Sequence, residues 1–186
     1  MALSEEHIQS NKKRFLSLIS SEEREGLGSI VDWLEQSTDF FKAPASTKYH
    51  GAYYGGLCEH SLNVNNLFNE ECEYQNLSVP SQSRKLCALL HDICKANLYV
   101  VGPRGGFTHK DENPLGHGEK SLSILQDHMK LSQQEKHLIR WHMGPFAAGE
   151  RYVYDAACAK YPEIVFFFCA DYRASWMDGV RRTWRE

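Results

Sequence analysis

The sequence predicts a mainly α-helical protein that carries one short β-hairpin. Apolar residues recur at three- and four-residue spacing along almost the whole chain, which is typical of helices that bury one face. Residues 98–101 and 107–110 resemble short strands instead, and they flank the glycine-rich turn Gly102-Pro103-Arg104-Gly105-Gly106. Together these observations favour an all-α helical bundle with a hairpin inserted into it.

Length and composition indicate an ordinary globular domain. The chain has 186 residues, of which 42% are hydrophobic and 24% are charged, so it is long enough to bury a substantial core. Its formal net charge of -3 argues against a protein whose main task is to coat nucleic acid, and we expect no binding to long duplexes. The oligomeric state is left open by these numbers.

Cellular location and redox state follow from two further features. The N-terminus shows no basic segment followed by an apolar one, and the longest strongly apolar run, residues 164–170, is far shorter than the roughly 20 residues that span a bilayer. We therefore expect a cytoplasmic protein with no membrane partner. None of the six cysteines forms a Cys-x-x-Cys pair, which favours reduced, mostly buried thiols.

Helix boundaries can be predicted from capping patterns. Ser4, Ser21 and Ser132 each precede acidic or amide residues in a way that suits a helix N-terminus, and Ser132 with Glu135 forms a full capping-box pattern. We expect two helices before about residue 44, then helices at about 56–75, 81–95, 115–129, 132–143 and 163–178, with a Gly/Ala loop before the last. The predicted division is an N-terminal helical extension, 1–47, and a main domain, 48–186.

Several predicted helices direct an imidazole or a carboxylate toward the core. Leu57 and Val64 place His60 on an apolar stripe, and Leu138 does the same for His142. An isolated buried ion costs several kcal/mol unless it is paired or bound to a metal. A lone inward histidine is most often a satisfied polar group of the core. The repetition on four helices, which includes His91-Asp92 and Asp171, favours a shared site.

These inward groups suit metal ions. With His117, from the segment Pro114-Leu115-Gly116-His117-Gly118, the candidate ligands are His60, His91, Asp92, His117, His142 and Asp171. Imidazole and carboxylate are common ligands of first-row transition metals, and the lack of paired cysteines argues against a closed structural zinc site. Six such residues can hold two ions bridged by a carboxylate, with positions left for water and substrate.

The ordered pattern H…HD…H…H…D resembles the HD superfamily of metal-dependent phosphohydrolases over about residues 48–178. The segments "HGAYYGGLCEHSL", "LLHDICK", "PLGHGEKS" and "CADYRAS" are most similar to the HD domain of a bacterial 3′-to-5′ exoribonuclease family. The resemblance implies an HD-domain helical bundle. That exoribonuclease family carries an oligonucleotide-binding β-barrel ahead of its HD domain, whereas residues 1–44 here indicate helices, so a nucleotide or short oligonucleotide substrate is favoured.

The resemblance also implies roles for the ligands. His60, His91, Asp92 and Asp171 would form the core metal site, and His117 and His142 would complete a second site with Asp92 as the bridge. Two divalent ions (Mn, Fe, Ni or Co) would activate a hydroxide that cleaves a phosphoester. Asp92 and Lys95 would be the catalytic residues, with Lys95 also contacting a phosphate oxygen. The alternative for Lys95 is a solvated cation at a helix C-terminus.

Further residues are candidates for substrate contact. His50 and Tyr53 precede the first ligand helix, Arg104 and His109 lie in the hairpin, and Arg173 follows Asp171 by two residues, on another side of the helix. Trp141 and Phe146 are candidates for stacking on a base, although packing in the core is the ordinary role of such aromatics.

Two other functions stay open at this point. Some six-ligand HD proteins hold two irons and are oxygenases, and the ligand set alone does not separate them from hydrolases; Lys95 favours hydrolysis. The other possibility is a catalytically silent module that binds metal and nucleotide without turnover. The intact ligand set argues against it.

Overall fold

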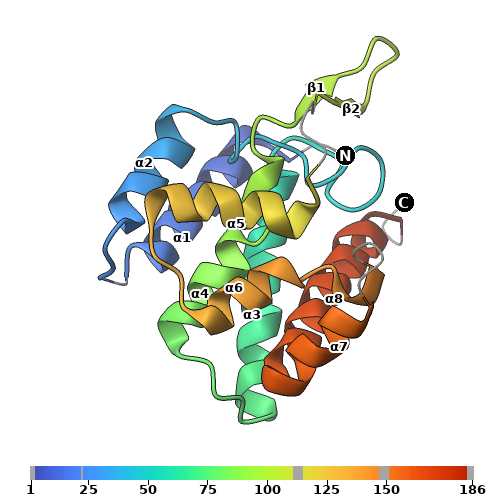
Figure 1. The fold of residues 1–186 in the computed structure, drawn as a ribbon. Coiled ribbons are helices and arrows are strands. Elements are labelled where there is room, and N and C mark those ends of the chain that lie inside the picture. The colour runs from blue at the N-terminus through green and yellow to red at the C-terminus, as the bar shows by residue number, and fades with distance from the viewer. Residues whose placement is uncertain (1–2, 22, 111–114, 147–150, 184–186) are drawn as a thin grey trace.

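The computed structural model describes residues 3–21, 23–110, 115–146 and 151–183. Within these ranges it contains eight α-helices, two short 3-10 helices and one two-stranded sheet (Figure 1). The α-helices are α1 (Glu5–Ile19), α2 (Leu27–Gln36), α3 (Gly56–Tyr74), α4 (Ser81–Leu90), α5 (His117–His128), α6 (Gln133–Arg140), α7 (Arg151–Lys160) and α8 (Glu163–Thr183). The 3-10 helices are η1 (Ile93–Lys95) and η2 (Gly144–Phe146). The predicted all-α class is confirmed.

The β-hairpin is also confirmed. Strands β1 (Tyr99–Val101) and β2 (Phe107–His109) pair antiparallel, with Val100 opposite Thr108. The hairpin extends away from the helical body in Figure 1, next to the loop that precedes α3. Its tip is exposed, so it adds little to the core.

Helix α3 is the central element of the bundle. It contacts α1, α4 and α8, and its inner face contributes Leu57, Val64 and Phe68 to the core. Residues of α1 and α2, among them Phe15 and Ile30, belong to the same buried cluster. One hydrophobic core therefore runs across position 47, and the division of the chain at that position stays a prediction.

An ion pair joins the N-terminal region to α6. Arg24 donates to Glu135 Oε1 at 2.6 Å and to Oε2 at 2.9 Å, and Glu135 also accepts from Ser83. The same Glu135 side chain accepts from the backbone N–H of Ser132, which completes the predicted capping box. Burial alone would raise the pKa of Glu135, but the hydrogen bonds from Arg24, Ser132 and Ser83 outweigh it and lower the pKa.

Some predicted boundaries were wrong. The helix expected at 81–95 ends at Leu90, and the helix expected at 132–143 ends at Arg140. The second helix begins at Leu27 and not after Ser21, because Gly26 turns the chain with a φ of 85° against the backbone of His128. Helix α7 lies where part of the Gly/Ala loop was expected.

Two chemical expectations can be compared with the fold. All six cysteines are free thiols, and four of them are buried, as predicted. Among the described residues, no helix is both long enough and apolar enough to cross a membrane.

Candidate metal centre

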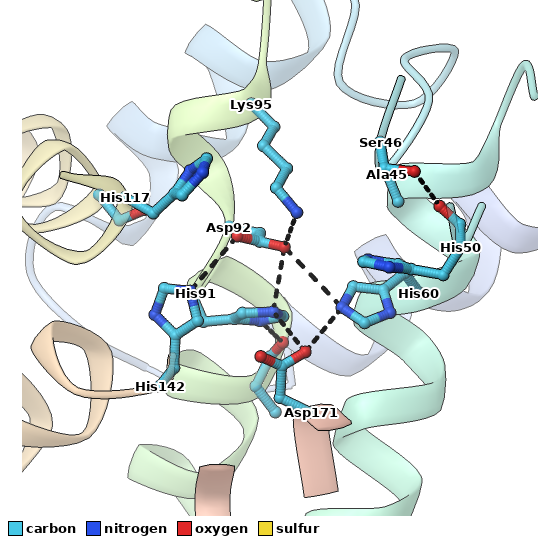
Figure 2. Close-up of polar contacts among 12 residues, drawn as sticks. Ala45, Ser46, His50, His60, His91, Asp92, Lys95, His117, His142 and Asp171 are labelled. Atoms are coloured by element: carbon cyan, nitrogen blue, oxygen red, sulfur yellow. Dashed lines mark hydrogen bonds and ion pairs between the residues drawn. The ribbon is translucent and has the colours of Figure 1, made fainter. Parts of the chain in front are cut away.

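The predicted ligands from four parts of the chain meet in the interior. His60 lies in α3, His91 and Asp92 follow the end of α4, His142 follows the end of α6, and Asp171 lies in α8. Figure 2 shows their side chains pointing toward one another. His60, His91 and His142 are completely buried, and the two aspartates are nearly so.

One part of this cluster is built around Asp171. Its Oδ1 lies 3.0 Å from His60 Nε2 and 3.7 Å from His91 Nε2. His60, His91 and Asp171 form a group whose donor atoms all lie within 4.8 Å of one another. Two imidazoles and a carboxylate at this separation are a suitable ligand set for a divalent transition-metal ion.

A second part of the cluster is built around Asp92. Its Oδ2 lies 3.3 Å from His91 Nε2, and its Oδ1 lies 3.4 Å from His142 Nε2 (Figure 2). His91, Asp92 and His142 also form a group within the same 4.8 Å limit. His91 thus belongs to both groups, and the two oxygens of Asp92 face different neighbours.

The ends of α4 and α6 fix the orientation of two histidines in the same way. His91 Nδ1–H donates to the carbonyl of Ala88 at 2.9 Å, and His142 Nδ1–H donates to the carbonyl of Ile139 at 2.7 Å. Both carbonyls belong to the last turn of a helix. The residue four positions later lies beyond the end of the helix, so these carbonyl oxygens have no partner N–H within the helix. Because a carbonyl only accepts, Nδ1 of each ring carries hydrogen, and in the neutral ring the lone pair is on Nε2.

These Nε2 atoms fit a metal ion. His91 Nε2, His142 Nε2 and Asp92 Oδ1 are buried and make no hydrogen bond. Buried polar atoms nearly always have a partner, and a carbonyl on the other ring nitrogen is the usual support of a metal-binding histidine. The geometry therefore supports the predicted roles of these residues as ligands.

Lys95 lies against the same carboxylate. Its Nζ is 2.6 Å from Asp92 Oδ2, and the side chain is buried. Burial alone would lower the pKa of Lys95 and raise that of Asp92, but their mutual attraction outweighs burial, so the pKa of Lys95 is raised and that of Asp92 is held well below its usual range. Lys95 is therefore not the solvated cation of the alternative interpretation.

His117 lies beside the cluster together with a residue that the sequence did not single out. His117 Nδ1 is 3.6 Å from Cys94 Sγ, and Asp92, Cys94 and His117 form a third group with donor atoms within 4.8 Å. Gly118 explains the position of this helix, because a Cβ there would lie 2.2 Å from the carbonyl oxygen of Arg140 in α6. Only glycine allows α5 to approach so closely.

Comparison with known proteins agrees with this geometry. The HD domain family matches residues 57–172, which is more than half of the chain. The chain belongs to the HD domain family. No curated protein and no solved structure matches it. Members of the HD family are typically metal-dependent phosphohydrolases, and the site described above contains the histidine-aspartate pair that gives the family its name.

A cavity opens beside the HD residues. It has a volume of about 450 Å³, and Asp92, Lys95, His117 and Asp171 lie in its wall. Residues 45–47, Tyr49 and His50 from the loop before α3, His109 from β2, and Phe168 and Tyr172 from α8 also line it. A small molecule in the cavity can therefore reach Asp92, His117 and Asp171 of the candidate ligand set.

His50 is positioned over the cluster by its own loop. Ser46 Oγ donates to the carbonyl of His50 at 2.7 Å, and the His50 ring lies with its centroid 4.8 Å from that of His60 (Figure 2). Burial lowers the pKa of His50 to about 4, with His60 and Lys95 adding to the effect. The imidazole is therefore neutral near pH 7.

The other predicted substrate contacts do not line the cavity. Tyr53 donates its hydroxyl to Glu59, Arg104 lies exposed at the tip of the hairpin, and Arg173 is paired with Glu71 on the outside of α8. Trp141 is buried against Tyr154. The side chain of Phe146 lies outside the described part of the chain. Of the predicted substrate contacts, His50, Lys95 and His109 face the cavity.

Proposed function

We propose that the chain is a metal-dependent phosphohydrolase that cleaves a phosphoester of a nucleotide or a short oligonucleotide. The observation that carries this proposal is the placement of His91 Nε2, His142 Nε2 and Asp92 Oδ1, which are buried without hydrogen bonds beside an open cavity. His60, His91, Asp92, His142 and Asp171 would hold the metal, with His117 completing a second position.

A divalent ion bound there would supply a water of lowered pKa and would neutralise charge on a phosphoryl oxygen. The chain's own residues do the rest. Asp92 Oδ2 lies beside His91 and Asp92 Oδ1 beside His142, so this carboxylate is suited to bridge two positions. Lys95 holds Asp92 ionised, and its ammonium lies in the cavity wall. There it can donate to a phosphate oxygen or to the leaving oxygen.

His50 is suited to orient the phosphate. Its Nε2 is buried and has no hydrogen-bond partner among the described residues, and the ring lines the same cavity as Lys95. Because the ring is neutral, it adds no positive charge to a site that already holds Lys95. A neutral imidazole can donate one hydrogen bond to a phosphate oxygen.

Aromatic side chains support a substrate that contains a base. Phe168, Tyr172 and Trp176 follow one another at four-residue intervals on α8, with centroid distances of 5.9 Å and 6.3 Å. Phe168 and Tyr172 line the cavity, and Tyr172 and Trp176 are more than half exposed. Such a row can stack on successive bases, each contact contributing about 1–3 kcal/mol. This aromatic row begins next to Asp171 and therefore favours a short oligonucleotide as the substrate. The sequence segments that resemble the exoribonuclease family agree with this.

The proposal is tested by phosphate release. The purified protein, loaded in turn with Mn²⁺, Fe²⁺, Co²⁺ or Ni²⁺, would be incubated with mononucleotides, cyclic dinucleotides, short RNA and a generic phosphodiester. His91→Ala with Asp92→Ala is the blank. We expect turnover of at least one nucleotide substrate, and none by the blank. Metal binding without any phosphoester cleavage, or oxygen uptake in place of it, would overturn the proposal.

A further inference from the structure

Cys94 lies in a group of potential metal ligands, and not simply in the core. It belongs to η1, directly after the HD pair, and its thiol faces His117 at the start of α5. The Cys94 Sγ to His117 Nδ1 distance is 3.6 Å, and both residues lie with a carboxylate oxygen of Asp92 inside a 4.8 Å group. Cys94 is 6% exposed, and His117 reaches the cavity wall.

The other cysteines lack this setting. Cys58, Cys72 and Cys87 are as buried as Cys94, but among the described residues Cys94 is the only cysteine that shares a group of this kind with a histidine and a carboxylate. Cys87, from the same segment of chain, faces the backbone carbonyl of Glu135. Burial alone therefore does not explain the surroundings of Cys94.

A second observation indicates that a cation belongs there. Asp92 Oδ2 is paired with Lys95, but Asp92 Oδ1 is buried and makes no hydrogen bond. In Figure 2, Oδ1 is the oxygen joined to His142, on the side of the carboxylate where His117 also lies. A buried carboxylate oxygen that makes no hydrogen bond, with the His142 and His117 imidazoles on its side, favours a positive charge next to it.

We propose that Asp92, Cys94 and His117 bind a second divalent ion through one oxygen, one sulfur and one nitrogen atom. The inference rests on the metal-binding part of the proposed function and not on phosphoester cleavage. Binding would replace the thiol proton of Cys94, which leaves to solvent, so one proton is released for each ion bound through sulfur. A thiolate ligand favours Zn²⁺, Co²⁺, Ni²⁺ or Fe²⁺ over Mn²⁺ and Mg²⁺, which prefer oxygen.

Cobalt titration tests this assignment directly. The metal-free full chain would be titrated with Co²⁺ while its near-ultraviolet absorption is recorded, because thiolate-to-cobalt charge transfer absorbs there and imidazole or carboxylate ligation does not. We expect the band in the wild type and in Cys87→Ser, which is the matched buried control. Cys94→Ser should lose the band. The ratio of its Zn²⁺ affinity to its Mn²⁺ affinity should be at least tenfold lower than in the wild type.

Two outcomes would overturn the proposal. One is the absence of the band from the wild type at two equivalents of cobalt. The other is a band of the same intensity in Cys94→Ser, which would assign it to other thiols.

If Cys94→Ser does not fold, X-ray absorption spectroscopy of a protein that retains Cys94 tests whether sulfur binds the metal. The Zn²⁺-loaded protein, with Cys158 and Cys169 changed to serine to remove the two less buried thiols, should show a sulfur neighbour at about 2.3 Å from zinc. Only nitrogen and oxygen neighbours would contradict the proposal. A positive result together with no phosphoester cleavage would retain this site and reject the proposed function.

Discussion

His142 Nε2 lies 3.4 Å from Asp92 Oδ1, and neither atom makes a hydrogen bond. Burial alone would lower the pKa of His142, but Asp92 outweighs burial and raises it, so the carboxylate favours a positive charge between the two atoms. A proton or a metal ion can supply that charge. The two residues follow the ends of α6 and α4, which explains why bundle folding alone brings them together.

Replacing His142 should weaken metal binding while the protein still folds. In His142→Ala the charge partner of Asp92 Oδ1 is lost, while the remaining helices still pack. We expect metal to raise the melting temperature of the wild type clearly, since a ligand at 100 times its Kd stabilises by about 2.7 kcal/mol, and to raise that of His142→Ala by less than half as much. Calorimetry with and without Co²⁺ measures this. Equal shifts in both proteins would show that His142 is not a ligand.

Lys95→Met should be rescued in part by metal. Removal of the ammonium leaves the buried Asp92 carboxylate without its 2.6 Å partner, which costs roughly 3–5 kcal/mol in the metal-free protein. A bound divalent ion would restore positive charge beside the carboxylate. We expect the loss of unfolding free energy in urea to be smaller with metal than without it, and activity to remain low.

The control for this variant is Lys130→Met, which removes an exposed lysine and should change stability by less than about 0.5 kcal/mol. An identical loss for Lys95→Met with and without metal would mean that no ion binds next to Asp92.

Gly118→Ala should displace His117. The added Cβ would lie 2.2 Å from the backbone carbonyl oxygen of Arg140, so α5 must move away from α6, at a cost of roughly 1–3 kcal/mol. We expect one equivalent of bound metal to be lost while the other remains, as measured by elemental analysis after dialysis.

Gly28→Ala is the matched control, because a Cβ at Gly28 meets nothing within 4 Å and a helical alanine is favoured by up to about 1 kcal/mol. Full metal content in Gly118→Ala, together with unchanged stability, would contradict the role given to this close helix contact.

Most of the fold and of the ligand cluster could be predicted from the sequence, because helical periodicity indicates both where the helices lie and which side chains point inward. The phase of Leu57 and Val64 fixed the inward direction of His60, and the same reasoning worked for His142 even though its helix ends two residues earlier. The end of α4 at Leu90 was missed because the segment "LLHDICK" contains neither glycine nor proline to mark a stop. The proximity of Lys95 to Asp92 was nevertheless expected, since a 3-10 turn also brings residues three apart together.

Contacts between distant segments were not visible in the sequence. The six cysteines were expected only to be reduced, mostly buried thiols, and the proximity of Cys94 to His117 becomes apparent only when α5 packs against η1. The contact between Arg24 and Glu135 joins residues 111 positions apart. Nothing in the sequence indicated that residues 45–47, at the end of the predicted N-terminal extension, would line the cavity.

The pair of Arg24 and Glu135 should make stability pH-dependent. The pKa of Glu135 is lower in the folded protein than its ordinary value of 4.5. The pair therefore stabilises the fold above about pH 4.5, and this contribution is lost as the pH falls through the lower folded-state pKa.

Glu135→Gln should thus unfold at lower urea concentration than the wild type at pH 7, and the difference should shrink toward pH 3. Glu25→Gln, an exposed change nearby, should show no such pH-dependent difference. A constant gap between Glu135→Gln and the wild type from pH 7 to pH 3 would argue against the ion pair as its cause.

Tyr172→Ala should weaken substrate binding without removing metal. If the exposed ring stacks on a base, its loss costs about 1–3 kcal/mol, so KM for a short oligonucleotide should rise roughly 5- to 150-fold, with kcat changed much less. Tyr74→Ala, at an 86% exposed tyrosine at the end of α3, is the control. An unchanged KM in Tyr172→Ala would remove the aromatic row from the substrate site.

The proposed function requires that the metal on which phosphoester cleavage depends is bound by His60, His91, Asp92, His142 and Asp171. The most direct measurement compares metal content and nucleotide hydrolysis in the wild type and in the variant His91→Ala with Asp92→Ala, each prepared with the same metal. We expect stoichiometric metal and phosphate release for the wild type, and neither for the variant. A variant that loses its metal but still hydrolyses the substrate would contradict the proposed function.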